Sequence, residues 1–242
     1  MLTKKNRVWA MAAVVVAVAG FSACLKTPDP GPPARPVASV VVLNASTFGA
    51  GFDLYDNGQK LGDGKTALGL GFTSPYPAYG GAHVFTFKKS GADSTVGTTS
   101  IMLDSLSYYT VMAYGQSPVK VVSFSDDVSN VKDNKVYYRV FHLSPNAGPV
   151  DIYIDNKKID SSRTYEDKFP RGFTALDLTS AAELIVKEAG KDAVLAKASN
   201  SSLKIPLSQG GVYTIYIAGL KDNLDAKKLF VNTTYGAVNL NR

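Results

Sequence analysis

His142, Ser144 and Asp151 are the residues whose types and spacing come nearest to a catalytic group. A serine, a histidine and a carboxylate form the triad of many hydrolases, in which the histidine takes the proton of the serine hydroxyl. The Gly-x-Ser-x-Gly turn that exposes such a serine does not occur around Ser144. The same serine and aspartate also recur 98 residues earlier, where an asparagine replaces the histidine. Polar residues at a strand end commonly fix a turn, so we predict no catalytic residue and no enzyme.

Residues that bind metals are too few and too scattered for a metal centre. The chain has two histidines, His83 and His142, and one cysteine, Cys24. Structural zinc sites need four ligands from closely spaced cysteines and histidines, so these three residues do not make one. The acidic pair Asp126-Asp127 lacks the spacing of a calcium loop. We therefore predict no metal site and no cofactor.

Tyr76 and Tyr79 are the candidates for ligand binding. They lie in the segment Ser74–Gly81, which reads SPYPAYGG and is expected to be a loop that presents aromatic rings. Such rings could stack on a sugar, which leaves glycan binding as an alternative. The only tryptophan of the chain is Trp9, near the N-terminus, which counts against a dedicated sugar platform. The simpler interpretation is that both tyrosines cover one end of the fold.

The first 24 residues have the pattern of a secretory signal that ends in a cysteine. Three basic residues precede an uncharged apolar run, and the small residues after this run are typical of a cleavage site. The closing letters FSAC resemble the lipobox of bacterial lipoproteins, in which the signal is cut before the cysteine and the thiol is diacylated. A lone thiol in an oxidising compartment fits that chemistry. We predict a signal peptide over residues 1–23 and lipidation of Cys24.

Residues 24–36 are predicted to be the lipidated cysteine and a Pro-rich linker. The stretch LKTPDPGPPARPV holds five prolines, which favours an extended, semi-rigid stalk. Leu25, in place of an aspartate, resembles the sorting pattern of outer-membrane lipoproteins. The expected location is the cell envelope, with the lipid anchor in the outer membrane of a Gram-negative bacterium.

Charge and hydropathy of the rest of the chain argue against a nucleic-acid partner and against a second membrane span. Removal of residues 1–23 lowers the net charge from +6 to +3, and no cluster of basic residues with interleaved aromatic residues remains. Nucleic acid is therefore not an expected partner. The remaining sequence has no second apolar run long enough to cross a bilayer. The anchor is then the expected contact with the membrane.

An internal repeat of about 100 residues, too long for one unit of a solenoid, indicates domain duplication. Residues 40–56 and 138–154 align without a gap at an offset of 98. The pairs at this offset include Asn44 with His142, Ser46 with Ser144 and Asp53 with Asp151. Later segments match at offsets of 99 and 104, so the insertions fall in loops between shared strands.

The local pattern throughout the repeat is that of β-strands. Short runs of β-branched and aromatic residues alternate with turn residues, among them the Asn57-Gly58 pair that is typical of a tight hairpin. We predict an all-β fold of two tandem immunoglobulin-like antiparallel β-sandwich domains, over residues 37–129 and 134–242. The polar connection, residues 126–134, is expected to act as a hinge.

Residues 138–155, YRVFHLSPNAGPVDIYID, resemble the opening of the family catalogued as domain of unknown function 4397. The matching motif positions are Arg139, His142, Ser144, Pro145, Asp151 and Tyr153. The first repeat resembles a degenerate copy, so the chain looks like tandem copies of this domain in a bacterial lipoprotein. The resemblance implies an immunoglobulin-like sandwich and no chemistry, and the motif residues are expected to be structural.

These observations together predict a non-enzymatic, lipid-anchored cell-envelope protein that acts as a binding, adhesion or assembly module. The alternative is a glycan-binding lipoprotein of a polysaccharide-uptake system, and an uncharacterised hydrolase is a third possibility. The expected partners are the membrane, through the anchor, and a glycan or an envelope protein.

Overall fold

The computed structural model describes residues 35–62, 67–132, 134–178 and 183–238, and in these ranges the protein is an all-β sandwich fold. Residues 36–242 form one compact unit. The strands of the first half are β1 (Val37–Ser46), β2 (Phe52–Asp56), β3 (Gln59–Lys60), β4 (Thr73–Tyr79), β5 (Gly81–Lys89), β6 (Thr95–Leu103), β7 (Tyr108–Gly115) and β8 (Lys120–Ser125). Those of the second half are β9 (Val136–His142), β10 (Val150–Ile154), β11 (Lys157–Arg163), β12 (Thr174–Leu176), β13 (Glu183–Glu188), β14 (Val194–Ser199), β15 (Val212–Ala218) and β16 (Phe230–Tyr235).

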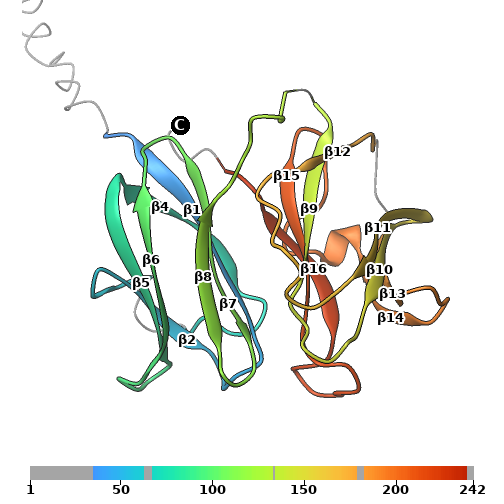
Figure 1. Ribbon diagram of the computed structural model, residues 1–242, viewed down its shortest axis with the longest axis horizontal. Helices are drawn as coiled ribbons and strands as arrows, with labels where there is room; N and C mark the ends of the chain where they lie inside the picture. Colours follow the sequence, from blue (N-terminus) through green and yellow to red (C-terminus); the bar gives the residue numbers. More distant parts are fainter. Residues whose placement is uncertain (1–34, 63–66, 133, 179–182, 239–242) are drawn as a thin grey trace, which may run out of the picture. The chain divides into compact units, whose positions relative to one another are not determined.

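Each half of the chain forms its own pair of four-stranded sheets, which we call the first and second sandwich. The first sandwich has the strand orders β4-β1-β7-β8 and β3-β2-β5-β6, and the second has β12-β9-β15-β16 and β11-β10-β13-β14. In Figure 1 the blue-to-green strands and the yellow-to-red strands form separate groups. No sheet of the described residues contains strands from both halves. Independent folding of residues 37–129 and 134–242 stays a prediction.

The strand register repeats between the two sandwiches as the sequence offsets require. Val42 of β1 pairs with Val111 of β7, and Val140 of β9 pairs with Ile215 of β15. These two pairs are parallel, whereas the other strand pairs are antiparallel. Because parallel neighbours need a long crossover, each sandwich closes its first sheet with chain that has already passed through the second sheet. The sequence pattern predicted the strands but not this parallel pair.

Three apolar clusters form the core. One lies inside the first sandwich around Phe52, Phe85 and Phe87, and a second lies inside the second sandwich around Ile152 and Ile215. The third joins the halves and contains Leu43, Ala45, Met112, Tyr114, Phe124, Phe141, Leu143, Tyr216 and Ala218. Its members on β1, β7, β9 and β15 lie on the face opposite to the one that supplies the first two clusters, so both faces of these strands are covered and nearly every residue in them is buried.

The interface between the halves is built from equivalent residues. Leu43 and Phe141 are 98 positions apart, as are Ala45 and Leu143, and all four lie in the third cluster. A buried hydrogen bond adds to it, because the Tyr216 hydroxyl donates to the Gly71 carbonyl of the other half at 3.2 Å. The interface therefore has an approximate twofold relation, like the surface that two identical subunits share.

The connection between the halves is itself bonded to the second half. The Asp127 N–H donates to the Arg171 carbonyl at 3.0 Å, and the Asn130 side chain donates to the Phe173 carbonyl. Domains joined by a large apolar interface do not move freely against one another. The contacts therefore argue against the hinge expected from the polar composition of residues 126–134.

Two local expectations have different outcomes. Asn57 and Gly58 both have positive φ, at 48° and 82°, and join β2 to β3, which confirms the tight hairpin. The segment Ser74–Gly81 was expected to be a loop, and this is wrong, because most of it belongs to strand β4. β4 is an edge strand, and prolines are tolerated there since one side of the strand needs no ladder donors.

Candidate functional site

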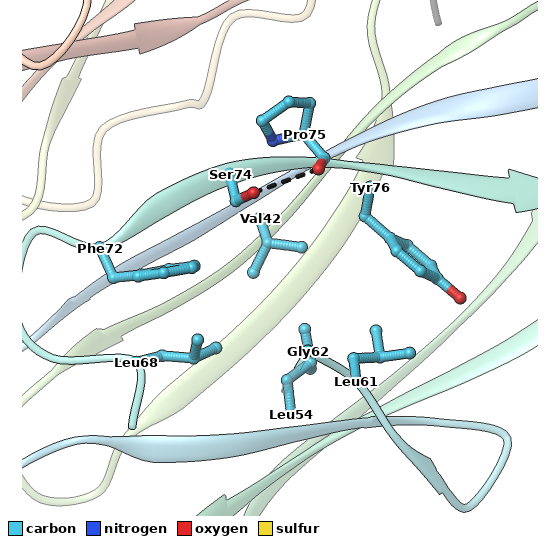
Figure 2. Close-up of a pocket in the computed structure, with 9 residues that line it drawn as sticks. All are labelled: Val42, Leu54, Leu61, Gly62, Leu68, Phe72, Ser74, Pro75 and Tyr76. Atoms are coloured by element: carbon cyan, nitrogen blue, oxygen red, sulfur yellow. Dashed lines mark hydrogen bonds between the residues drawn. The ribbon is translucent and has the colours of Figure 1, made fainter. Parts of the chain in front are cut away.

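A pocket of about 330 Å³ opens between the two sheets of the first sandwich. It is lined by Val42, Leu54, Leu61, Gly62, Leu68, Phe72, Ser74, Pro75 and Tyr76. Figure 2 shows Val42, Phe72 and Tyr76 reaching from the β1 and β4 layer toward Leu54, Leu61 and Leu68 on the opposite side. Small-molecule sites have this size, and they too are mainly apolar with few polar groups.

The pocket opens on the side of the first sandwich where β3 and β4 are the edge strands of the two sheets. On one side of the first sandwich β6 and β8 approach each other, and the Thr99 and Ser123 hydroxyls lie 2.8 Å apart. On the other side the edge strands are β4 and the two-residue β3. Val42 and Leu54 are buried core residues of β1 and β2, so they form the floor. The half-buried Leu61 and Tyr76 form part of the rim.

A hydrogen-bond network around Asp56 positions Tyr76. The Tyr76 hydroxyl donates to Asp56 Oδ2 at 3.0 Å, and His83 Nδ1 lies 2.8 Å from both carboxylate oxygens. Burial, and then the hydrogen bond to Asp56, raise the pKa of Tyr76 to about 12. The Asp56 side chain is nearly inaccessible, at 7% exposed, so its partners fix its position. Tyr76 therefore offers the pocket its ring rather than its hydroxyl.

Tyr79 does not share this pocket. It is three residues after Tyr76 on β4, which places the two side chains on opposite faces of the strand. Tyr79 is 54% exposed, and its carbonyl accepts a hydrogen bond from His83 Nε2 at 2.9 Å. The two tyrosines therefore do not form one aromatic platform.

His142 and Ser144 fix the turn after β9. His142 Nδ1 accepts the Ser144 N–H at 3.3 Å, so Nε2 carries the proton and donates to the Gly148 carbonyl at 2.8 Å. Burial lowers the pKa of His142, and the nearby Arg163 adds to this effect. Pro145 lies half-buried in the same turn. In the first sandwich Asn44 has the equivalent role, because its Oδ1 accepts a hydrogen bond from the Ser46 N–H at 2.9 Å.

Asp151 forms its hydrogen bonds with residues other than His142. It accepts hydrogen bonds from Lys158 Nζ at 2.8 Å and from the Ser162 N–H at 2.9 Å, and these partners lower its pKa. The Tyr153 ring lies near the same lysine, with Lys158 Nζ 5.5 Å from the ring centre. Among the described residues, Ser144, His142 and Asp151 thus do not form the hydrogen-bonded chain of a catalytic triad.

Arg139 lies in the interface between the sandwiches. Its Nη1 donates to Asp126 Oδ1 at 2.7 Å, Nε donates to Thr214 Oγ1 and Nη2 donates to Thr110 Oγ1, both at 2.8 Å. The guanidinium also stacks 4.6 Å from the centre of the Phe173 ring. The side chains of Arg139 and Asp126 are almost wholly buried. Sequence reasoning placed Arg139 in a structural motif but did not find its partner across the interface.

Three other predictions concern a metal site, a second membrane span and the N-terminal segment. In the described parts of the chain, no group of three or more His, Cys, Asp or Glu residues is placed to hold a metal ion. Within the same residues, no helix is long and apolar enough to cross a membrane. Cys24, the signal segment and most of the linker lie outside the described residues.

Comparisons with known proteins add a family model and a weak likeness in fold. Residues 38–153 match the model described as Domain of unknown function (DUF4397), so the match covers the first sandwich and continues into β10. No curated protein matches this chain. One similar solved structure concerns alpha-glucan binding by a streptococcal virulence factor, at 13% identity and a TM-score of 0.21, over 81% of this chain and 97% of that one. Another concerns alpha-glucan recognition by family 41 carbohydrate-binding modules from streptococcal virulence factors, at 8% identity and a TM-score of 0.24, over 81% and 96%. Scores this low leave the ligand to be argued from the residues of the chain itself.

Proposed function

We propose that this protein is a non-enzymatic, lipid-anchored binding module of the cell envelope, and that its ligand site is the pocket of the first sandwich. The observation that carries the proposal is an apolar pocket of about 330 Å³ whose floor consists of the core residues Val42 and Leu54. Natural cores are normally filled to high density, so an opening of this size is a candidate site rather than a packing defect. The tandem copies of one domain and the outer-membrane location belong to the same proposal.

The lining favours an apolar ligand group over a sugar. Six of the nine lining residues are Val, Leu, Phe or Pro. The Ser74 hydroxyl donates to the Pro75 carbonyl at 3.2 Å, and the Tyr76 hydroxyl is bonded to Asp56. A sugar buried in such a pocket would leave hydroxyl groups without partners, which costs free energy. A branched aliphatic or aromatic group of a small molecule or of a partner protein suits it better.

Binding of a fluorescent apolar probe, N-phenyl-1-naphthylamine, tests the site. Leu61→Trp adds bulk at the rim and is expected to weaken probe binding by about tenfold, or about 1.4 kcal/mol. Ile159→Trp is the matched control, because Ile159 is the equivalent residue of the second sandwich and also packs against a core. Equal binding by both variants would contradict the site. Saturable binding of an oligosaccharide that Leu61→Trp weakens would favour the glycan alternative instead.

The anchor is tested separately by Cys24→Ser. This change is expected to abolish labelling by a fatty-acid analogue and to release the protein from the membrane fraction, since a thiol is needed for the acyl linkage. A variant that labels and fractionates like the wild type would show that the protein is not anchored through Cys24.

A further inference from the structure

Four of the six exposed large apolar residues lie at one end of the first sandwich. Among the described residues the six are Tyr79, Val84, Met102, Leu106, Val194 and Leu224, and the first four belong to the first sandwich. Met102 is 63% exposed and pairs with Ala82, two residues from Val84 on the same face of β5. Leu106 is the third residue after the end of β6. We call Val84, Met102 and Leu106, together with Tyr79 at the same end of the opposite sheet, the end patch.

Leu106 occupies an unfavourable backbone conformation without gaining burial. Its φ is +67°, in the left-handed region, and its side chain is 62% exposed. The equivalent residue of the second sandwich is Gly210, with φ +75°. The surrounding hydrogen bonds are the same, because the Leu106 N–H donates to the Val37 carbonyl and the Gly210 N–H donates to the Lys135 carbonyl, both at 3.0 Å. A bulky residue kept where glycine suffices points to a function for its side chain.

The end patch lies where the chain enters the fold. Val37, the first residue of β1, pairs with Tyr79 of β4 and accepts the hydrogen bond of Leu106. Only 12 residues, 25–36, separate Val37 from Cys24 in the sequence. Fully extended, 12 residues span about 40 Å, so a lipid on Cys24 keeps this end of the sandwich within that distance of the bilayer.

We propose that the end patch seats the first sandwich on the bilayer that carries the anchor, with Leu106 and Met102 in the interfacial region. The proposal rests on the lipid anchoring proposed above. A sandwich held off the membrane would leave the two side chains, each more than 60% exposed, in water. Tyr79 suits such a position, because tyrosine is favoured at the level of the lipid headgroups. Asp104 lies in the same turn as Leu106, which favours a zwitterionic over an anionic surface.

Tryptophan fluorescence in vesicles tests the end patch. The full chain, matured in a bacterial host, is reconstituted into phosphatidylcholine vesicles in which some of the lipid is brominated in its acyl chains. Leu106→Trp and Met102→Trp report on the end patch, and Leu224→Trp, at a residue 96% exposed in the second sandwich, is the control. Trp9 is the only native tryptophan and lies in the segment expected to be removed, so any remaining background is common to all variants. Brominated lipid is expected to quench the two end-patch variants about threefold more strongly than the control.

The outcomes separate this inference from the anchor. Vesicle flotation that depends on Cys24, together with stronger quenching of Leu106→Trp and Met102→Trp, supports the end patch. Flotation with equal quenching in all three variants overturns the end patch and leaves the anchor standing. Protein that does not float overturns both. A blue-shifted Leu106→Trp emission without quenching by brominated lipid means that a protein covers the end patch, and this overturns the bilayer as its partner.

Discussion

The two sandwiches share a set of hydrogen bonds at equivalent positions but differ in several other side chains. In each, an aspartate of the second strand accepts hydrogen bonds from a lysine and a glycine N–H: Asp53 with Lys60 and Gly91, and Asp151 with Lys158 and Gly190. In each, a buried tyrosine accepts a backbone N–H from five residues upstream: Tyr109 from Asp104, and Tyr213 from Ser208. The repeat therefore preserves the parts that hold one sandwich together.

The differences lie in what each sandwich adds to this frame. The first has Asp56 beside the pocket and the exposed Leu106, where the second has the buried Ile154 and Gly210. The second has Arg139 in the interface, where the first has Val41. The second half thus uses the motif residues identified in its sequence for structure, and the first half, which the family model covers, carries the pocket. The motif residues serve the fold, and none of them lines the pocket.

Arg139→Val gives the second sandwich the residue of the first and should have the largest effect. It leaves the Asp126 carboxylate buried without its cation, so the free energy of unfolding is expected to fall by about 3–5 kcal/mol. Urea unfolding measures this loss. Arg163→Val is the control, because Arg163 pairs with Asp160 near the surface and such pairs contribute about 1 kcal/mol or less. Similar losses for both variants would mean that Arg139 does not hold the interface.

Asp56→Ala removes the hydrogen bonds that join Asp56 to Tyr76 and His83; the equivalent residue of the second sandwich is Ile154. The Tyr76 hydroxyl and His83 lose their shared partner, which is expected to cost about 1–3 kcal/mol of stability and to weaken probe binding in the pocket. Thermal unfolding and the probe titration measure the two effects. Asp93→Ala, at an exposed carboxylate of the same sandwich, should change neither. Unchanged probe binding in Asp56→Ala would separate the network from the pocket.

His142→Asn replaces the histidine by the residue that the first sandwich uses. Burial lowers the pKa of His142 below its ordinary value of 6.5, so the unfolded chain takes up this proton at a higher pH than the folded chain. The free energy of unfolding of the wild type should therefore fall as the pH drops below about 6.5, while above it the contribution is complete. The difference between wild type and His142→Asn, measured by urea unfolding between about pH 5 and 7, isolates this group. A difference that does not change with pH would refute a neutral, buried His142.

Leu106→Gly should give the smallest effect and the opposite sign. Glycine relieves the left-handed conformation, so the variant is expected to be more stable by about 0.5–1 kcal/mol in the absence of membranes. The reverse change, Gly210→Leu, should destabilise the second sandwich, since a Cβ there would lie 2.6 Å from Asn134 Oδ1. Thermal unfolding measures both. If Leu106→Gly were less stable than the wild type, the Leu106 side chain would stabilise the folded protein by packing within it, without any membrane.

Local sequence signals were sufficient for strands such as β1, β7, β9 and β15 and for the first hairpin turn, because these depend on neighbouring residues. The β-branched run of β1 and the Asn57-Gly58 pair are examples. The repeat then predicted equivalent positions, such as Val42 and Val140, which the strand register bears out.

Features that combine distant segments could not be read in the same way. The pocket takes residues from β1, β2, β4 and the chain between β3 and β4, none of which carries a local sign of a cavity. The partners of Arg139 lie 13 and 75 residues away, at Asp126 and Thr214. Strand β4 was missed because prolines normally argue against a strand, and only its edge position permits Pro75 and Pro77.

The parallel pairing of β1 has a mechanical consequence. Force applied at Val37, the end nearest the proposed anchor, pulls β1 along its own axis. β1 is paired from Ser39 to Ser46 with β7 and from Val37 to Leu43 with β4. Such a pull loads the two ladders in shear, so their bonds must break together rather than one after another. Tension that would peel open a hairpin is thus resisted by the whole length of the first strand, and the lifetime under load depends on the rate of that single unfolding step.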